Sequence, residues 1–268
     1  MDGLSAPELQ RAKGRIEFHL KGPKIERLYQ AGCAKLMLPK TYGKMTEAVM
    51  LNTAGGITGG DRLDVKIKAE DCALVATTQT AERLYRSSSS PAHISVDLQA
   101  SKAAILHWLP QETIIFDGAE LDRTITLNMS ADSRCLLAET VILGRQAMGE
   151  QLSKCHFTDN WRLYRDGHLF HAESMRLKGN VKQIMAAAAC GNGAISLSTI
   201  LYAGSDAEQQ SAAIDAILQN CTSTCAASYW EDRVVVRLVS ANAAAARIDI
   251  NQILYAVRQQ PMPRVWQI

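Results

Sequence analysis

Polar side chains that could carry chemistry are concentrated in three short blocks of the sequence. The blocks span residues 77–87, 109–121 and 139–150, and their charged or amide side chains include Glu82, Arg83, Arg86, Gln111, Glu112, Asp117, Glu139, Arg145 and Glu150. Charges beside Gly or Pro at strand ends commonly belong to solvated turns. Their concentration among bulky apolar neighbours favours a second interpretation, a shared polar surface or channel.

Sequence motifs of hydrolases and of structural metal sites are absent. The chain has no G-x-S-x-G elbow and no H-E-x-x-H helix, and no Ser or Cys is marked as activated by its neighbours. Cys221 and Cys225 are four residues apart, and His168 and His171 are three apart, but neither pair has a partner pair at zinc-finger spacing. We therefore expect no nucleophilic enzyme and no structural zinc.

A glycine-rich loop at 51–63 contains Gly55, Gly56, Gly59 and Gly60. It lacks the Lys-Ser/Thr of a P-loop, and a period-two strand follows it where a dinucleotide fingerprint needs a helix. The simplest interpretation is a tight connection between strands at 47–52 and 62–69. The alternative is a glycine-lined surface that another backbone or a polar conduit approaches closely, with Asp61 at the start of a strand.

Strands with period-two alternation must position these blocks. Residues 62–69 place Leu63, Val65 and Ile67 on one face and charged side chains on the other, and 93–100 and 233–239 alternate similarly. More uniformly apolar runs are typical of strands buried on both faces. We predict a mostly β, layered body of many short strands, with two late helices at 205–220 and 241–260. Ser205 and Glu208 predict a capping box for the first helix.

Composition is that of an ordinary globular protein. The 268 residues are 47% hydrophobic and 21% charged, with a net charge of +2, which gives no reason to expect binding to nucleic acid or membrane. The N-terminus lacks a signal-peptide pattern, so we expect a cytoplasmic protein. Residues 1–68 hold 12 basic and 7 acidic residues, a local charge of +5. This skew indicates either a solvated basic face or a basic docking edge.

Five segments in order carry a resemblance to a known family. "GGITGGDRL", "TTQTAERLYRS", "LPQETIIF", "LGRQAMGE" and the terminal "PMPRVWQI" resemble the urease accessory proteins called UreD, or UreH in some organisms. The resemblance runs from about residue 13 to the C-terminus and implies a single domain over 1–268. It also implies a β-helix-like winding of strands. Residues 1–12 match nothing, and we expect them to be a disordered N-terminal segment.

The resemblance implies a non-enzymatic maturation factor. Proteins of this family help to install the nickel centre and the carbamylated lysine of urease, as a scaffold that bridges the accessory proteins UreF and UreG, a GTPase, to the urease apoprotein. No tightly bound cofactor is implied, but nickel in transit is, and a polar tunnel through the β body has been proposed as its route. The motif positions that we expect to line the tunnel or an interface are Gly55, Gly56, Gly59, Gly60, Arg62, Tyr85, Arg86, Ser87, Gln111, Glu112, Gly144, Arg145, Gly149 and Glu150.

A transit path for nickel needs weak oxygen ligands, because clustered thiolate or imidazole ligands would hold the ion tightly. On this hypothesis Asp61, Glu139 and Glu173 are inward-facing carboxylates on the path. The competing interpretation pairs each carboxylate with an arginine such as Arg62, Arg86 or Arg145.

Two other points stay open. For partner binding we expect Tyr229, Trp230 and Trp266 to be anchors, against the alternative that each is core packing. Two functions compete with nickel transfer: a β-helical carbohydrate-active enzyme that uses paired carboxylates, and a purely structural interaction protein.

Overall fold

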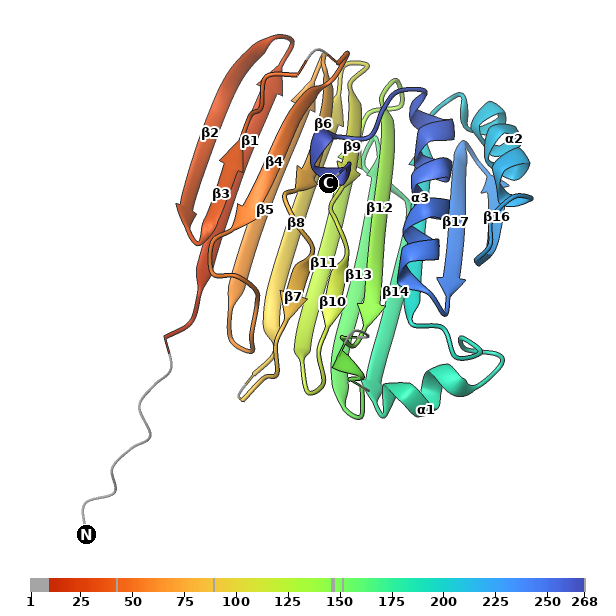
Figure 1. Cartoon of the computed structure of the whole chain (residues 1–268). Helices are drawn as coiled ribbons and strands as arrows, with labels where there is room; N and C mark the ends of the chain where they lie inside the picture. Colours follow the sequence, from red (N-terminus) through yellow and green to blue (C-terminus); the bar gives the residue numbers. More distant parts are fainter. Residues whose placement is uncertain (1–9, 42, 89, 146–147, 151, 268) are drawn as a thin grey trace.

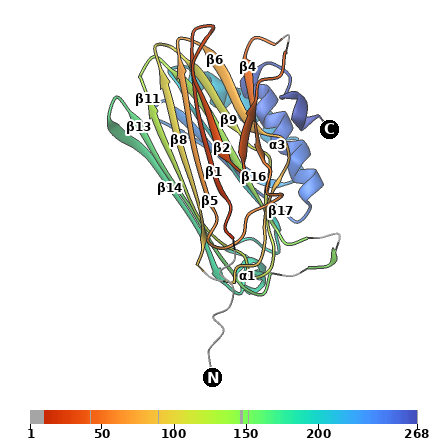
Figure 2. The same ribbon diagram turned by 90° about the vertical axis from the view of Figure 1, so that its left-hand side faces the viewer.

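The described residues form two facing β-sheets, with two helices covering the outer face of one sheet (Figures 1 and 2). The computed structural model describes residues 10–41, 43–88, 90–145, 148–150 and 152–267. Sheet A has the order β14 (His168–Gly179), β13 (Cys155–Arg165), β11 (Glu120–Met129), β8 (Ala92–Ser101), β5 (Arg62–Glu70), β1 (Lys13–Lys21) and β2 (Lys24–Gly32). Sheet B has the order β16 (Thr224–Trp230), β17 (Arg233–Ser240), β15 (Ser196–Ala203), β12 (Arg134–Leu143), β9 (Ile105–Leu109), β6 (Ala73–Thr78), β4 (Thr46–Asn52) and β3 (Ala34–Met37). Two short strands also belong to it: β10 (Thr113–Ile115) pairs with β12, and β7 (Glu82–Leu84) pairs with β10.

The chain alternates between the two sheets as it winds. From β5 it passes to β6, then β8, β9, β11, β12 and β13, so that each sheet receives one long strand per coil. The neighbouring strands β5, β8, β11 and β13 are therefore parallel, as are β4, β6, β9 and β12. This arrangement confirms the predicted mostly β fold with a helix-like winding.

The last third of the chain changes to antiparallel pairing and adds the helices. Strands β14, β15, β17 and β16 all pair antiparallel with their neighbours. The two predicted late helices are α2 (Ala207–Leu218) and α3 (Ala243–Arg258), and a short helix α1 (Val181–Ala186) was not predicted. The predicted capping box is wrong, because α2 has Asp206 as its N-cap residue without a side-chain capping bond. Asp206 instead accepts a hydrogen bond from the Tyr202 hydroxyl.

The apolar core has three parts that follow the layers. The largest lies between the sheets and contains Ile16, Val65, Leu98 and Leu127. A second joins sheet B to α2 and α3 through side chains such as Ile214 and Ile253, and the predicted apolar stripe of α3 is buried there. The third closes the end of the sandwich near α1. In the described part of the chain, no helix is both long and apolar enough to cross a membrane.

The predicted disordered segment at 1–12 lies mostly outside the described residues. Residues 10–12 are described, and the last of them is held in place: Ala12 N donates to Asp61 Oδ1 at 2.7 Å, and its carbonyl accepts from Arg62 N. Within the predicted segment, Ala12 is therefore held through its backbone by two hydrogen bonds, to the start of β5 and to the loop before it.

Candidate functional site between the sheets

Sheet B is interrupted where the three polar blocks cross it. β6 stops at Thr78 and its continuation β7 starts at Glu82, while β9 stops at Leu109 and β10 starts at Thr113. Gln111 spans the gap, because its amide Nε2 donates to the carbonyls of Gln79 and Val265. Pro110, which follows β9, has no N–H to donate, and this agrees with the interruption of the ladder at that point.

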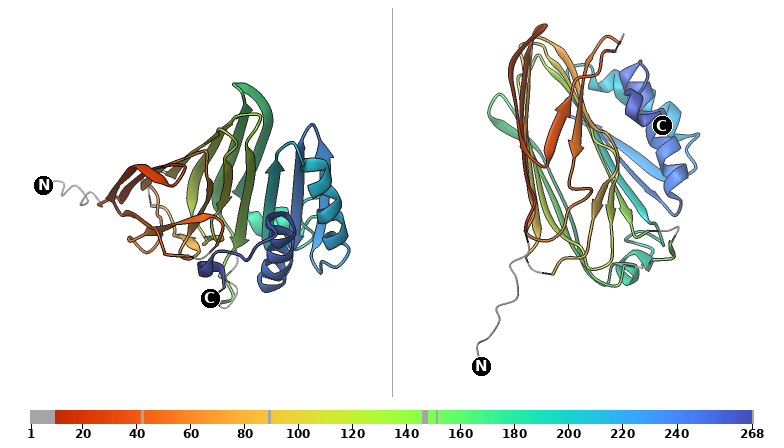
Figure 3. Two further views of the ribbon diagram at one scale, coloured as in Figure 1. Left: turned by 90° about the horizontal axis from the view of Figure 1, so that it is seen from above. Right: turned by 60° about the vertical axis from the view of Figure 1, so that its left-hand side comes forward.

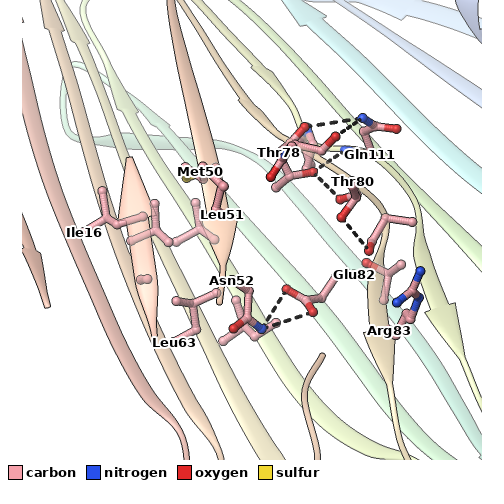
Figure 4. A pocket seen from close by; sticks show the side chains of 18 of the residues that line it. Ile16, Met50, Leu51, Asn52, Leu63, Thr78, Thr80, Glu82, Arg83 and Gln111 are labelled. Carbon is pink, nitrogen blue, oxygen red and sulfur yellow. Dashed lines mark hydrogen bonds between the residues drawn. The ribbon is translucent and has the colours of Figure 1, made fainter. Parts of the chain in front are cut away.

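A cavity of about 300 Å³ lies between the sheets at this interruption (Figure 4). One wall is apolar and belongs mainly to sheet A, with Ile16, Leu63, Val65, Ile94 and Val96. The opposite side is polar, with lining side chains that include Asn52, Thr78, Gln79, Thr80, Glu82, Gln111, Thr113 and Glu139. Arg123 is the charged residue that sheet A adds to the lining. A concave cavity with an apolar wall and convergent polar groups is typical of a binding site for a small molecule or ion.

Arg123 is the centre of a buried polar cluster at the inner end of this cavity. Its guanidinium pairs with Glu139 Oε2 from sheet B and with Asp159 Oδ2, at 2.7 Å, from the next strand of sheet A. The indole N–H of Trp108 donates to Glu139 Oε1 at 2.8 Å, and that of Trp161 donates to Asp159 Oδ2 at 3.1 Å. The Arg123–Glu139 ion pair thus connects the two sheets, while the indole hydrogen bonds and the Arg123–Asp159 hydrogen bonds each lie within one sheet.

Burial sets the protonation of this cluster. Removal from water raises the pKa of Glu139, the Asp159 charge adds to the rise, and the Arg123 guanidinium opposes it. The two carboxylates raise the pKa of Arg123 above that of a free guanidinium, despite its burial. Arg123 is therefore permanently charged, whereas the raised pKa of Glu139 makes this carboxyl easier to protonate than a free one.

Glu82 is a second carboxyl of the cavity and has a different environment. Both of its oxygens lie 3.2 Å from Asn52 Nδ2, which donates to them and to the Gly56 carbonyl (Figure 4). Burial raises the pKa of Glu82 to about 7, and the hydrogen bond from Asn52 only partly offsets this. Glu82 therefore exchanges its proton near neutral pH.

The polar layer continues from Glu139 across sheet B. Glu139 on β12 lies opposite Thr199 on β15, which in turn lies opposite Arg237 on β17, and paired residues share one face of a sheet. Arg237 donates to Glu173 Oε2 at 2.6 Å, and Glu173 extends from β14 at the edge of sheet A. Contacts with His171 and Arg237 lower the pKa of Glu173. A row of polar side chains therefore runs between the sheets from the cavity to the opposite edge.

The three predicted carboxylates do not converge on one site. Glu139 lines the cavity, Glu173 lies further along the polar layer, and Asp61 sits in the glycine loop, where it accepts N–H groups from Ala12 and Thr58. Nowhere in the described ranges do three or more His, Cys, Asp or Glu side chains gather in an arrangement that could hold a metal ion.

Ion pairing of two of these carboxylates is confirmed, but the predicted arginines were wrong. Glu139 pairs with Arg123 and Glu173 pairs with Arg237. The arginines that the sequence suggested have partners close by: Arg62 pairs with Asp64, Arg86 with Asp117 and Arg145 with Glu150.

The glycine loop connects β4 to β5, and hence sheet B to sheet A, and two of its glycines are explained by close backbone approach. Ile57 forms an isolated parallel bridge with Leu84, so the loop lies directly against β7. A Cβ on Gly56 would lie 2.3 Å from the Tyr85 ring, and one on Gly59 would lie 1.9 Å from Ser87 Oγ. The loop is therefore the predicted connection between the two strands, and the close approach that the alternative required comes from residues 83–87 and 90 of the same chain.

Other motif residues form a cluster at the end of the sandwich near α1. The Tyr85 and Phe116 rings meet edge to face at 5.1 Å, and the Arg145 guanidinium lies 4.5 Å from the centre of the Phe116 ring. Glu150 accepts from the Arg145 backbone and guanidinium, and so closes the turn that starts at Gly144. Gly149 also has a positive φ of 65°. These residues hold loops in place and leave Tyr85 exposed at the surface.

Gln111 and Glu112 anchor the C-terminal segment over the gap in sheet B. Arg247 on α3 pairs with Glu112 and donates to the Trp266 carbonyl, while the Trp266 indole donates to Thr77 Oγ1 at 3.0 Å. Trp266 is buried, which agrees with the packing alternative and not with an exposed anchor. Tyr229 and Trp230 are exposed on the edge strand β16, and the Arg233 guanidinium lies 3.6 Å from the centre of the Trp230 ring.

Arg123, Asp159 and Asn52 were missed by the sequence reasoning, although two of them carry a signal. Arg123 occupies the apolar register of its strand, between Leu121 and Ile125, and Asp159 does the same between Phe157 and Trp161. A charge on the core face of an alternating strand indicates a buried ion pair. Asn52 carries no such signal.

These features define the class: a coiled, two-sheet β protein that encloses a polar layer between its sheets. The family model described as UreD urease accessory protein matches residues 10–267, and the chain belongs to this family. An alignment of 274 residues with the urease accessory protein UreD of Chelativorans sp. (strain BNC1) shows 41% identity, and it covers 100% of this chain and 98% of that protein. It is 39% identical over 264 residues to the UreD protein of Jannaschia sp. (strain CCS1), covering 98% of each.

Proposed function

We propose that this chain is a non-enzymatic urease maturation factor that bridges the UreF–UreG accessory complex to the urease apoprotein. In this role it assists insertion of nickel into the metallocentre, and the polar layer between the sheets is the path of the ion. The observation that carries the proposal is the row of cross-strand polar residues that leads from the cavity to Glu173 at the opposite edge.

The charges of the cavity suit a divalent cation in transit. The formal charges of Glu82, Glu139 and Asp159 and of the cations Arg83 and Arg123 sum to −1. This charge attracts a divalent cation without neutralising it fully. Because Glu82 is protonated below about pH 7, an entering ion displaces a proton from it.

The ligands are also of the kind that releases the ion. Carboxylate, amide and carbonyl oxygens are harder ligands than the thiolates and imidazoles with which nickel forms tight sites. Among the described residues that line the cavity, Trp108 is the one aromatic, and its indole N–H donates to Glu139. Since Arg123 binds both Glu139 and Asp159, this carboxylate pair has little freedom for acid–base cleavage of sugars.

The test is co-expression of the urease subunits and the other accessory proteins with and without this chain, followed by an assay of nickel-dependent urease activity. Loss of activity in assembled apo-urease supports the maturation role, and unchanged activity refutes it. The variants Glu82→Gln and Glu139→Gln then test the path, with Glu208→Gln on the exposed start of α2 as the control. If both cavity variants form the accessory complex and activate urease normally, the path is wrong and the scaffold role remains.

A further inference from the structure

Strand β2 is an unusually open edge of sheet A. It pairs only with β1 in the part of the chain that the structure describes, and lies at the end of the sandwich remote from α2 and α3 (Figures 1 and 3). Eight of its nine residues are exposed to solvent. In an antiparallel pair every second residue directs its N–H and C=O away from the partner strand, so the outer edge of β2 offers a row of free backbone groups.

The inner face of β2 extends the core surface beyond the sandwich. Leu28 lies opposite Phe18 and Ile25 lies opposite Leu20, so these pairs share the face that is turned toward sheet B. Phe18 and Leu20 are buried, whereas Leu28 and Ile25 are 44% and 45% exposed. Sheet B ends at the four-residue strand β3, where Leu36 N donates to the Gln30 side chain. The apolar side chains further along β2 are left uncovered.

The segment of the chain that contains β2 is strongly basic. Residues 10–45 contain nine Lys and Arg (Arg11, Lys13, Arg15, Lys21, Lys24, Arg27, Lys35, Lys40 and Lys44) and two acidic residues, Glu17 and Glu26, for a net charge of +7. The side chains of Lys24 and Arg27 on β2 itself are 74% and 58% exposed, and they pair with Glu26 and Glu17. The basic skew of the sequence therefore lies in the segment that contains the open edge, and two of its cations are exposed on β2.

We propose that β2 is a docking edge for an extended, acidic segment of another protein, which adds to sheet A as a further strand. Its backbone pairs with the free edge of β2, its inward apolar side chains cover Leu28 and Ile25, and its acidic side chains meet Lys24 and Arg27. Pairing of β2 with a second copy of this chain is disfavoured, because it would bring two edges of the same charge together.

The test uses the full chain and three fluorescent nine-residue peptides. One alternates Glu with Val, the second alternates Lys with Val, and the third is the Glu–Val peptide with alternate backbone nitrogens methylated. Anisotropy measures binding, and hydrogen exchange locates it. We expect the acidic peptide to bind and to protect residues 24–32, and the other two to bind about tenfold or more weakly. Equal binding of the acidic and basic peptides, no binding of any, or protection elsewhere overturns the proposal.

Variants of the chain separate the contributions. Lys24→Glu combined with Arg27→Glu, and separately Leu28→Gln, should each weaken binding of the acidic peptide by about tenfold. Leu169→Gln is the matched control, because Leu169 is 53% exposed on β14 at the other edge of the same sheet, and it should leave binding unchanged. Circular dichroism verifies that each variant is folded. A concentration-dependent dimer that protects 24–32 without any peptide would identify a second copy as the occupant and refute the proposal.

Discussion

Replacement of Glu82 by Gln should stabilise the protein at alkaline pH and leave it almost unchanged at acid pH. The Glu82 carboxyl is mostly buried, and its pKa of about 7 in the folded chain lies above the ordinary value of 4.5. A carboxyl whose pKa is raised by folding favours the folded state while it is protonated. That contribution is present below pH 4.5 and is lost as the pH rises through 7.

The size of the effect follows from the two pKa values. Each pH unit between 4.5 and 7 corresponds to about 1.4 kcal/mol, so full ionisation of Glu82 lowers the free energy of unfolding by about 3 kcal/mol. Glutamine resembles the protonated carboxyl in shape and keeps an oxygen for the Asn52 amide. The variant should therefore exceed the natural chain in stability by about 3 kcal/mol at pH 8 and by less than about 1 kcal/mol at pH 5.

Urea denaturation at pH 5, 6, 7 and 8 measures this difference directly. Glu208→Gln, at an exposed position on α2, is the control and should follow the natural chain at every pH. A stability difference between Glu82→Gln and the natural chain that does not change from pH 5 to pH 8 would refute the reasoning. It would mean that Glu82 is ionised from pH 5 to pH 8 in the folded chain. An entering nickel ion would then have no proton to displace from Glu82.

Three further substitutions test the structure. Arg123→Met leaves two buried carboxylates without their cation and should lower the free energy of unfolding by about 3–5 kcal/mol in urea denaturation, and a change below about 1 kcal/mol would contradict the buried cluster. Gly56→Ala drives a Cβ against the Tyr85 ring and should cost about 2 kcal/mol or more, whereas Gly43→Ala, with nothing within 4 Å, should be nearly neutral in the same assay. Trp266→Phe removes the indole N–H that bonds Thr77, so thermal unfolding should show a loss of about 1–3 kcal/mol, and an unchanged midpoint would indicate that the bond is not formed.

Most of the fold could be predicted from local patterns, because alternation fixes both the element type and the face that is buried. The segment at 62–69 is β5, and the apolar stripe at 246–257 is the buried side of α3. The helix α1 has only six residues, too few for its periodicity to be distinguished from that of a loop. The capping box failed because α2 starts at Ala207, so its N-cap residue is Asp206 and not Ser205, and the Asp206 side chain accepts from Tyr202 instead of capping the helix.

The site was less predictable because its partners come together only through the winding. Glu139 was selected from its sequence block, but its cation is on β11 and its indole donor is on β9, in different coils of the chain. The pairing order of the strands decides such contacts, and a single sequence does not encode that order locally. Trp266 shows the same limit, since its aromatic character fits an exposed anchor as well as the core position that it occupies.

The alternation of the chain between the sheets has a consequence for synthesis on the ribosome. Each new coil adds one strand to the open side of each sheet, so a partly made chain always ends in two unpaired edges that can capture other chains. On that side, growth stops when the antiparallel strands β14 to β17 and the helices have emerged. A chain truncated before residue 168 should therefore be prone to aggregation. The C-terminal third ends the winding of the chain between the two sheets.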